Sequence, residues 1–438
     1  MMAPSRPSIA RPRPRLERVT VMMALIIAGE AVFSLPFHVA RFFRPTVLAV
    51  FELSNTELGA AQAVYGVVAM LAYFPGGPLA DCFSARRLLT VSLLATSVGG
   101  LYFATFPPYH ALSLLFGFWG LTTILLFWAA LIRATREWGG DQEQGRAFGF
   151  LDGGRGLFAA VLASAAVAVF QQLMPDDPNA ATDVIRAQAL RGVVYTYTAV
   201  TASTGVLCWL FVPERPDALP VRESLWTHIG AVMRLRTVWL QALVIVCAYV
   251  GYKGVDDYSL YAVQAYGMNE LEGARVATIS AWVRPFAAIG AGWLGDRISA
   301  SRVSALCFAL MVGSYTWLAF ATPRPTMLWV LYLNVLVTCA AIFGLRGVYF
   351  ALFQEAGVPL AATGTAVGLV SLIGYTPDIF VNLVAGWLLD RTPGVYGHQQ
   401  FFAFLVATSV VGFLAALAFA AAPTSSRAKT SLPSKIGP

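Results

Sequence analysis

Charged side chains are scarce in this sequence. Asp, Glu, Lys and Arg make up 12% of the 438 residues, and hydrophobic residues make up 58%. Soluble domains contain roughly 25% charged residues, so this composition excludes an ordinary soluble protein. The apolar residues come instead in blocks long enough to cross a hydrocarbon layer of about 30 Å as helices. The sequence therefore predicts an integral membrane protein.

Histidine and cysteine are also scarce. The chain has 4 His and 5 Cys, and the cysteines are scattered without a Cys-x-x-Cys pair. This pattern excludes a disulfide framework and a cysteine metal cluster. No His–carboxylate or Cys–His spacing supports catalysis. We therefore expect no enzyme activity and no catalytic residue, and neither a metal nor another cofactor.

The apolar blocks predict an all-α membrane protein with twelve transmembrane helices, because continuous apolar runs favour helices over a closed barrel. Polar loops rich in Pro, Gly, Asp and Arg separate these blocks. The predicted spans are 19–42, 57–80, 87–106, 109–133, 146–171, 191–212, 238–264, 274–295, 303–322, 326–352, 361–389 and 400–422.

The longest polar connection between spans covers residues 213–237 and divides the helices into two groups of six. We predict an N-terminal bundle at 19–212 and a C-terminal bundle at 238–422, joined by this cytoplasmic linker. Residues 1–18 form a basic, proline-rich tail and residues 423–438 a polar tail, and we expect both to be disordered.

Basic residues cluster in the tails and in alternate loops. The net charge is +7, which we attribute to orientation of the helices in the bilayer and not to a nucleic-acid partner. Arg86, Arg87, Arg136, Arg297 and Arg302 all fall on the side that would hold the N-terminus. Because such loops stay in the cytoplasm, both termini are predicted to be cytoplasmic. In a bacterium the protein would lie in the inner membrane.

A short phrase of Gly, Asp and Arg occurs after the second span and again after the eighth. The two copies are Gly77, Asp81 and Arg86, and Gly292, Asp296 and Arg302. The glycine permits close approach of a neighbouring helix, and the aspartate can pair with the arginine or with the N-terminus of another helix. We predict a conformation-dependent clamp. A third, weaker copy, Gly386 to Arg391, falls on the opposite side.

Two such phrases half a protein apart resemble the signature loops of the major facilitator superfamily. Cys82 and Ser84 replace the Arg and Gly that are usual there, and the resemblance covers nearly the whole chain. It implies two six-helix bundles built from inverted repeats around a central cavity at the midplane. It also implies a secondary transporter that works by alternating access.

Charged residues inside the predicted spans indicate where the cavity lies, since an uncompensated charge in lipid costs several kcal/mol. Asp152 and Arg155 share one helix face, and so do Lys253, Asp256 and Asp257. As candidates for substrate binding we take Arg41, Arg155, Tyr252, Lys253, Arg284 and Arg346. As candidates for coupling or ion pairing we take Glu30, Asp152, Asp256, Asp257 and Asp378.

The cations predict a small anionic substrate, because guanidinium and ammonium groups can cradle an anion. The carboxylates could pair these cations or carry protons, and the sequence leaves proton coupling and counter-anion exchange open. For Arg155 two interpretations also stay open: a substrate ligand oriented by Asp152, or an ion pair with Asp152 that merely holds the fifth span.

The stretch from Trp128 to Leu157 further resembles the organophosphate:phosphate antiporters and their anion:cation symporter relatives. Arg133, Trp138 and Gly145 match the layout of that region, and the resemblance places Arg155 where those transporters have a substrate-facing His. Gly254–Ser259 resembles their seventh span, whose substrate Arg would fall on Tyr252. His38, near Arg41, occupies the position of their first-span Arg. Organic-anion symport or antiport is therefore the predicted function.

Other functions are weighed against this one. Efflux of a drug-like or metabolite substrate is the main alternative, although the fifth span lacks the Gly-Pro-x-x-Gly-Gly pattern of drug antiporters. The span also lacks the Asn-Gly-rich run of nitrate carriers, which makes that subclass less favoured. A sensor would need a signalling domain, for which the tails are too short. A passive channel would not need paired gate loops. We expect a monomer whose partners are the lipid bilayer and a small anionic molecule.

Overall fold

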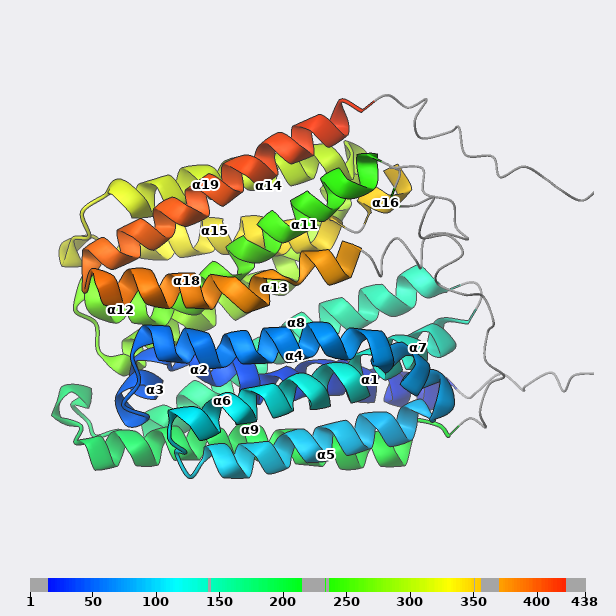
Figure 1. Cartoon of the computed structure of the whole chain (residues 1–438), viewed down its shortest axis with the longest axis horizontal. Coiled ribbons are helices and arrows are strands. Elements are labelled where there is room, and N and C mark those ends of the chain that lie inside the picture. The colour runs from blue at the N-terminus through cyan, green and yellow to red at the C-terminus, as the bar shows by residue number, and fades with distance from the viewer. Residues whose placement is uncertain are drawn as a thin grey trace, which may run out of the picture.

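The computed structural model describes residues 15–140, 143–214, 233, 236–349, 351–355 and 370–422. Within these residues the chain is helical and contains no strand, which confirms the predicted class (Figure 1). Most of the two predicted tails and of the linker at 213–237 lies outside the described residues. The same holds for the first nine residues of the predicted eleventh span, 361–369.

The first half of the chain supplies six long helical stretches, three of which are interrupted or joined by shorter elements. They are α1 (Arg15–Phe33), η1 (Ser34–His38), α2 (Val39–Phe42), α3 (Arg44–Val50), α4 (Asn55–Cys82), α5 (Ala85–Phe103), α6 (Tyr109–Gly120), η2 (Leu121–Trp128), α7 (Ala129–Gly139), α8 (Gln144–Leu173), η3 (Pro178–Ala180) and α9 (Asp183–Phe211).

The second half repeats this plan. Its elements are α11 (Arg236–Gly254), η4 (Val255–Asp257), α12 (Tyr258–Tyr266), α13 (Glu270–Arg297), α14 (Ala300–Phe320), η5 (Pro325–Met327), α15 (Leu328–Val348), α16 (Leu352–Glu355), α18 (Pro377–Arg391) and α19 (Val395–Ala420). The described start of α1 and the end of α19 lie at the same end of the molecule, on the right in Figure 1.

In the described residues, each of the twelve predicted spans corresponds to helix. Ten helical stretches in the described part of the chain are long and apolar enough to cross a membrane. The other two, α5 and α13, have 19 and 28 residues and are less apolar, because α5 has Arg86 and Arg87 in its first turn and α13 has charged residues in its first and last turns. The sixth span starts at Asp183, eight residues before its predicted start, because the Thr182 side chain caps the helix.

Helix interruptions gather at the level of the central cavity. Pro36 lies in η1, a π-helical segment, and a second π-helical segment forms η2. In the second half, η4 is a 3₁₀ turn between α11 and α12, and turn residues Tyr375 and Thr376 precede Pro377 at the start of α18. Proline removes a backbone donor, and irregular backbone at membrane depth is tolerated where it lines a cavity. These breaks aim side chains into the cavity.

Candidate functional site

A central cavity lies between the two halves of the chain, and all six predicted substrate-binding residues line it. They come from five elements: Arg41 from α2, Arg155 from α8, Tyr252 and Lys253 from α11, Arg284 from α13 and Arg346 from α15. Aromatic side chains supply much of the remaining wall: Phe33, Phe37, Tyr65, Tyr73, Trp128, Tyr249 and Tyr375. The predicted residues therefore face one space.

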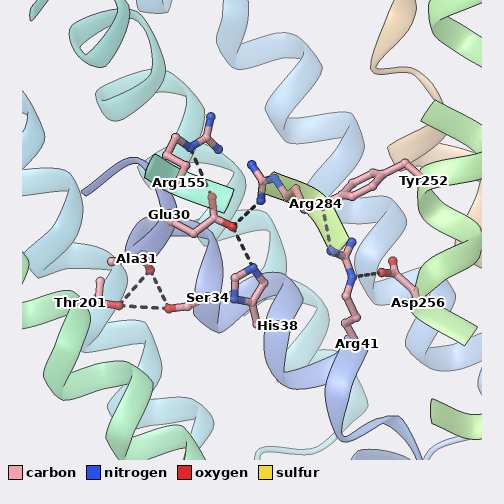
Figure 2. Close-up of polar contacts among 10 residues, drawn as sticks. All are labelled: Glu30, Ala31, Ser34, His38, Arg41, Arg155, Thr201, Tyr252, Asp256 and Arg284. Carbon is pink, nitrogen blue, oxygen red and sulfur yellow. Dashed lines mark hydrogen bonds and ion pairs between the residues drawn. The ribbon is translucent and has the colours of Figure 1, made fainter. Parts of the chain in front are cut away.

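Glu30 occupies the centre of one cluster in this cavity (Figure 2). Its carboxylate lies 3.0 Å from an Arg284 nitrogen, 3.3 Å from Arg155 Nε and 3.3 Å from His38 Nε2. Glu30 is 3% exposed. Arg155 belongs to the first half of the chain and Arg284 to the second, so one buried carboxylate joins the two halves.

A second cluster joins the halves through Asp256. Its two oxygens lie 2.5 Å from Arg41 Nε and 3.0 Å from Lys253 Nζ. Lys253 also lies 3.4 Å from Asp378, which accepts a hydrogen bond of 3.0 Å from the Tyr249 hydroxyl. Arg41, Lys253 and Asp256 are buried. Buried charges require such partners, because removing one partner of a buried pair typically costs about 3–5 kcal/mol.

Arg346 differs from the other cations of the cavity. It has no carboxylate within ion-pair distance among the residues that the structure describes. Its guanidinium carbon instead lies 4.1 Å from the Tyr252 ring centroid, and the guanidinium of Arg41 lies 4.5 Å from the same centroid. The Tyr252 hydroxyl accepts a hydrogen bond of 2.9 Å from Arg41. Cation–π contact holds Arg346 but leaves its N–H donors for another acceptor.

Three of the predicted coupling residues, Asp152, Asp256 and Asp257, do not line this cavity, although Asp256 pairs with two residues that do. The Asp152 side chain is 72% exposed and is 3.4 Å from Arg155. This contact is longer and more exposed to solvent than those around Glu30. Asp257 does not pair with Lys253. It accepts a hydrogen bond of 2.7 Å from His398 Nδ1, behind the cavity wall, and His398 also contacts Gln264 at 2.9 Å. Asp257 faces away because it follows Asp256 directly on η4.

Two histidines of the ion clusters, His38 and His398, were not predicted to contact the carboxylates. His38 follows Glu30 by eight residues, close to two helical turns, so the spacing indicates a shared helix face but not the contact. His398 pairs with Asp257 across 141 residues. No local pattern in the sequence indicates that contact.

Helices α4 and α18 form a close seam between the halves (Figure 1). On α18, the residues at the seam repeat every four positions: Asp378, Asn382, Gly386 and Asp390. A Cβ atom added at Gly59 would lie 2.2 Å from the Asn382 backbone oxygen, and one at Gly66 would lie 2.7 Å from the Asp378 backbone. Glycine thus allows the two backbones to touch.

The seam ends in a helix cap. The Asp390 carboxylate accepts hydrogen bonds from the backbone N–H groups of Asn55, at 3.1 Å, and Thr56, at 2.7 Å, and from the Asn55 side chain at 3.0 Å. These donors begin α4, where backbone N–H groups lack partners within the helix. Nearby, Glu270 accepts from Thr46 at 3.1 Å and pairs with Arg186 at 3.0 Å. We call this the latched end.

The two stronger copies of the Gly–Asp–Arg phrase lie at the other end, which we call the motif end. Asp81 and Asp296 are exposed there, and neither has a hydrogen-bond or ion-pair partner in the described part of the chain. No atom lies within 4 Å of a Cβ added at Gly77 or Gly292. Arg86 contacts Glu214 at 3.9 Å, and Arg302 is also exposed. The structure does not bring the predicted gate residues together, and their clamp stays a prediction.

Arg133 and Trp138, which match the layout of the organophosphate:phosphate antiporters, make contacts at the motif end and do not line the cavity. Arg133 donates hydrogen bonds to the backbone carbonyls of Ala80 and Phe83, which flank Asp81. The Trp138 indole donates to the Arg18 carbonyl at 2.7 Å, and the Arg18 guanidinium lies over its ring. These two residues therefore hold the ends of α1, α4 and α7 together.

Comparisons with known proteins agree with this architecture. The family model described as Major Facilitator Superfamily matches residues 19–377. Inner membrane protein YqcE of Escherichia coli is 28% identical over 91% of this chain and 93% of its own length. A probable nitrate/nitrite transporter, NarK2 of Mycobacterium tuberculosis, is 26% identical over 82% of this chain and 86% of its own length.

A solved structure has the same fold. It is a bacterial homologue of the human lysosomal transporter Spinster in an inward-facing, unoccupied conformation. It superposes with a TM-score of 0.72 at 14% identity, over 93% of this chain and 98% of that one. At this identity the likeness concerns the fold alone.

Proposed function

Because the chain belongs to the major facilitator superfamily of membrane transporters, we propose that it moves a small organic anion across the membrane by alternating access. The transport would be coupled to protons or to a counter-anion. Members of this family are transporters and not enzymes, and inner-membrane relatives such as YqcE place the chain among integral membrane proteins.

The unpaired Arg346 carries this proposal. Arg41, Arg155, Lys253 and Arg284 each have a carboxylate within 3.4 Å, whereas Arg346 has none among the described residues. A half-buried guanidinium without an anion is costly unless another anion reaches it. The cavity also holds more cations than carboxylates, since Glu30 and Asp378 line it together with five basic side chains. Asp256, which does not line the cavity, pairs with Arg41 and Lys253 and still leaves an excess of positive charge. An anionic substrate would neutralise this excess of positive charge.

The wall of the cavity supports an organic rather than an inorganic anion. Tyr73 and Tyr375, from opposite halves, have ring planes within 14° of parallel and centroids 6.4 Å apart. Phe33, Phe37 and Trp128 add apolar surface. Ligand sites combine such apolar walls with a few placed polar groups. The same wall would suit the alternative, efflux of a drug-like or metabolite substrate, but a cationic drug would be repelled by the excess of positive charge.

The test begins with a thermal-shift screen of sugar phosphates, sulfonates and carboxylates, followed by uptake into proteoliposomes. Replacing Arg346 by Ala should weaken binding of the selected anion by about 1.5–3 kcal/mol, the usual contribution of a hydrogen bond to a charged group. Lysine at this position keeps the charge but loses the planar fork, so it should restore only part of the affinity.

Arg324→Ala is the matched control, because Arg324 is exposed and lies outside the central cavity. It should bind the anion as the wild type does. Equal affinity of the Arg346→Ala variant and the wild type would show that Arg346 is no ligand. Selective binding of lipophilic cations would favour the efflux alternative.

A further inference from the structure

The cluster around Glu30 contains more than a static ion pair. We propose that Glu30 is a proton-binding site and that its carboxylate competes with the anionic substrate for Arg155 and Arg284. The protein would then bind one proton with each anion. This inference rests on the proposed function and deepens it, because it names the coupling ion and a second subsite for the anionic group.

The first observation is that Glu30 satisfies neither arginine fully. Arg155 Nε lies 3.3 Å from Glu30 Oε2, but both atoms lack a properly aligned hydrogen bond. Arg284 donates through one terminal nitrogen, at 3.0 Å. A bidentate pair would use two parallel N–H donors of each guanidinium. Both side chains therefore keep donors that an incoming carboxylate, sulfonate or phosphate could use.

The second observation is the position of the two arginines. Figure 2 shows them approaching Glu30 from different elements, with His38 on a further side. Arg155 lies on α8 and Arg284 on α13, and a Cβ added at Gly156 would lie 3.3 Å from the Arg284 side chain. The two guanidiniums thus meet where α8 and α13 pack together. An anion bound by both would hold the halves as Glu30 now does.

The third observation concerns the other groups that face Glu30. His38 on η1 is the titratable neighbour, with Nε2 at 3.3 Å and no partner for Nδ1. On the α9 side, Thr201 bonds to Ser34 and to the Ala31 carbonyl and contributes no charge. Asp152 contacts Arg155 but is largely exposed. Among the described residues, Glu30 is the one buried carboxylate that pairs with Arg155 and Arg284, so Glu30 is the acid on which the proton would reside.

Competition follows from electrostatics. An anion placed on Arg155 and Arg284 beside an ionised Glu30 would bring two negative charges together in a site shielded from water. Like charges at such distances cannot both stay ionised cheaply. If a proton binds to the Glu30 carboxylate, the repulsion disappears and both guanidiniums become free for the substrate. Release of the anion restores the Glu30 ion pairs and expels the proton.

The experiment uses detergent-purified, full-length protein and two anions whose charge is constant over the range tested, gluconate and methanesulfonate. Affinities are measured by calorimetry between about pH 5 and about pH 8. If one proton binds with each anion, the Kd should rise about tenfold per pH unit above the pKa of the Glu30 carboxyl. Glu30→Gln cannot bind the proton and should bind the anion with the same Kd throughout.

Infrared spectroscopy provides a readout that needs no transport. The protonated carboxyl band of Glu30, identified by its absence in Glu30→Gln, should grow when gluconate is added. Glu30→Asp keeps the acid and should retain the pH dependence, and Glu143→Gln, a carboxyl outside the cavity, should behave as the wild type. His38→Gln tests whether the proton resides on His38 instead. In that case no carboxyl band would grow in the wild type, and the pH dependence would disappear in His38→Gln.

The outcomes separate the two proposals. Anion binding that is independent of pH, or equally dependent on pH in the wild type and Glu30→Gln, would overturn the proton site and leave anion transport standing. A failure of both anions to bind at any pH, in either protein, would count against the anionic substrate and against the competition with it.

Discussion

The two ends of this transporter use the same Gly-x-x-x-Asp phrase in opposite states. At the latched end, Gly386 packs on the Asn55 backbone and Asp390 caps the start of α4. At the motif end, Asp81 is exposed, and a Cβ added at Gly77 would have no atom within 4 Å. The sequence at the motif end is closer to the family signature, yet the weaker copy is the one in contact.

This difference shows that the Gly-x-x-x-Asp phrase allows a helix–helix contact but does not by itself form one. Its glycine allows a helix to come close, and its aspartate can satisfy the free N–H groups of a helix that arrives. Whether the contact exists depends on which end of the molecule is closed. In an alternating-access cycle, the copies at Asp81 and Asp296 would engage when the contacts of Asp390 are released.

The largest expected effect comes from filling the glycines. A Cβ at residue 386 would lie 2.3 Å from the Asn55 carbonyl oxygen, so Gly386→Leu should destabilise the latched conformation by about 3 kcal/mol, the upper range for overpacking. Gly77→Leu meets no atom in this conformation and should instead block closure of the motif end. Both variants should lose transport, but for opposite conformational reasons.

Spin labels at Thr105 and Tyr396, exposed residues on opposite halves near the latched end, can distinguish these reasons in a background in which the exposed Cys82 is replaced by Ser. The distance between labels should increase in Gly386→Leu and stay short in Gly77→Leu. Transport by Gly77→Leu at the rate of the wild type would show that the signature glycine needs no neighbour.

A smaller effect is expected from the aspartates. Asp390→Ala removes a helix cap, a loss of about 0.5–2 kcal/mol, and should shift the same label distance toward the open form. Asp81→Ala and Asp296→Ala remove exposed side chains, so they should leave the latched distance unchanged. If these residues clamp the motif end, their loss should slow transport more than it weakens substrate binding. Unchanged turnover in both variants would show that these aspartates do not clamp the motif end.

The smallest effect concerns Glu143 at the motif end. Its carboxylate lies 2.6 Å from Arg18 and 3.1 Å from Arg146, and the hydrogen bond from Arg18 lowers the pKa of Glu143. The stabilisation is therefore present above the usual carboxyl pKa and is lost as pH falls through the lowered value. Glu143→Gln should have a slightly lower Tm than the wild type near neutral pH, and the difference should vanish in acid. A difference that persists in acid would exclude the ion pair as its cause.

Most of the fold could be predicted, because spans depend on apolar length and composition alone. The errors lie at helix ends, where a single cap decides the boundary. Thr182 begins α9 before the apolar run starts, and the run itself carries no signal of that cap. Interruptions such as η2, which contains neither Pro nor Gly, are also absent from any local pattern.

The six predicted substrate-binding residues line the cavity, but the sequence did not indicate most of their ion-pair partners. An ionisable residue inside a span must face a cavity or a partner, and this rule found Arg41, Arg284 and Arg346. Which carboxylate each cation contacts depends on how the halves dock. The Arg284–Glu30 pair spans 254 positions, so spacing on one helix could not indicate it. Lys253 is three residues from Asp256 and four from Asp257, a spacing that allows either pair, and the structure contains the pair with Asp256.

The seam between α4 and α18 also has a kinetic consequence. Gly59, Gly66 and Gly386 place backbone against backbone, so there are few side chains that could rearrange to follow a gradual separation. A small opening would break the contacts along the whole row, and the N–H groups of Asn55 and Thr56 would lose Asp390 at the same time. Interfaces packed in this way switch between two states and do not deform continuously. Single-molecule traces of this transporter should therefore show abrupt transitions between two levels, without a populated level between them.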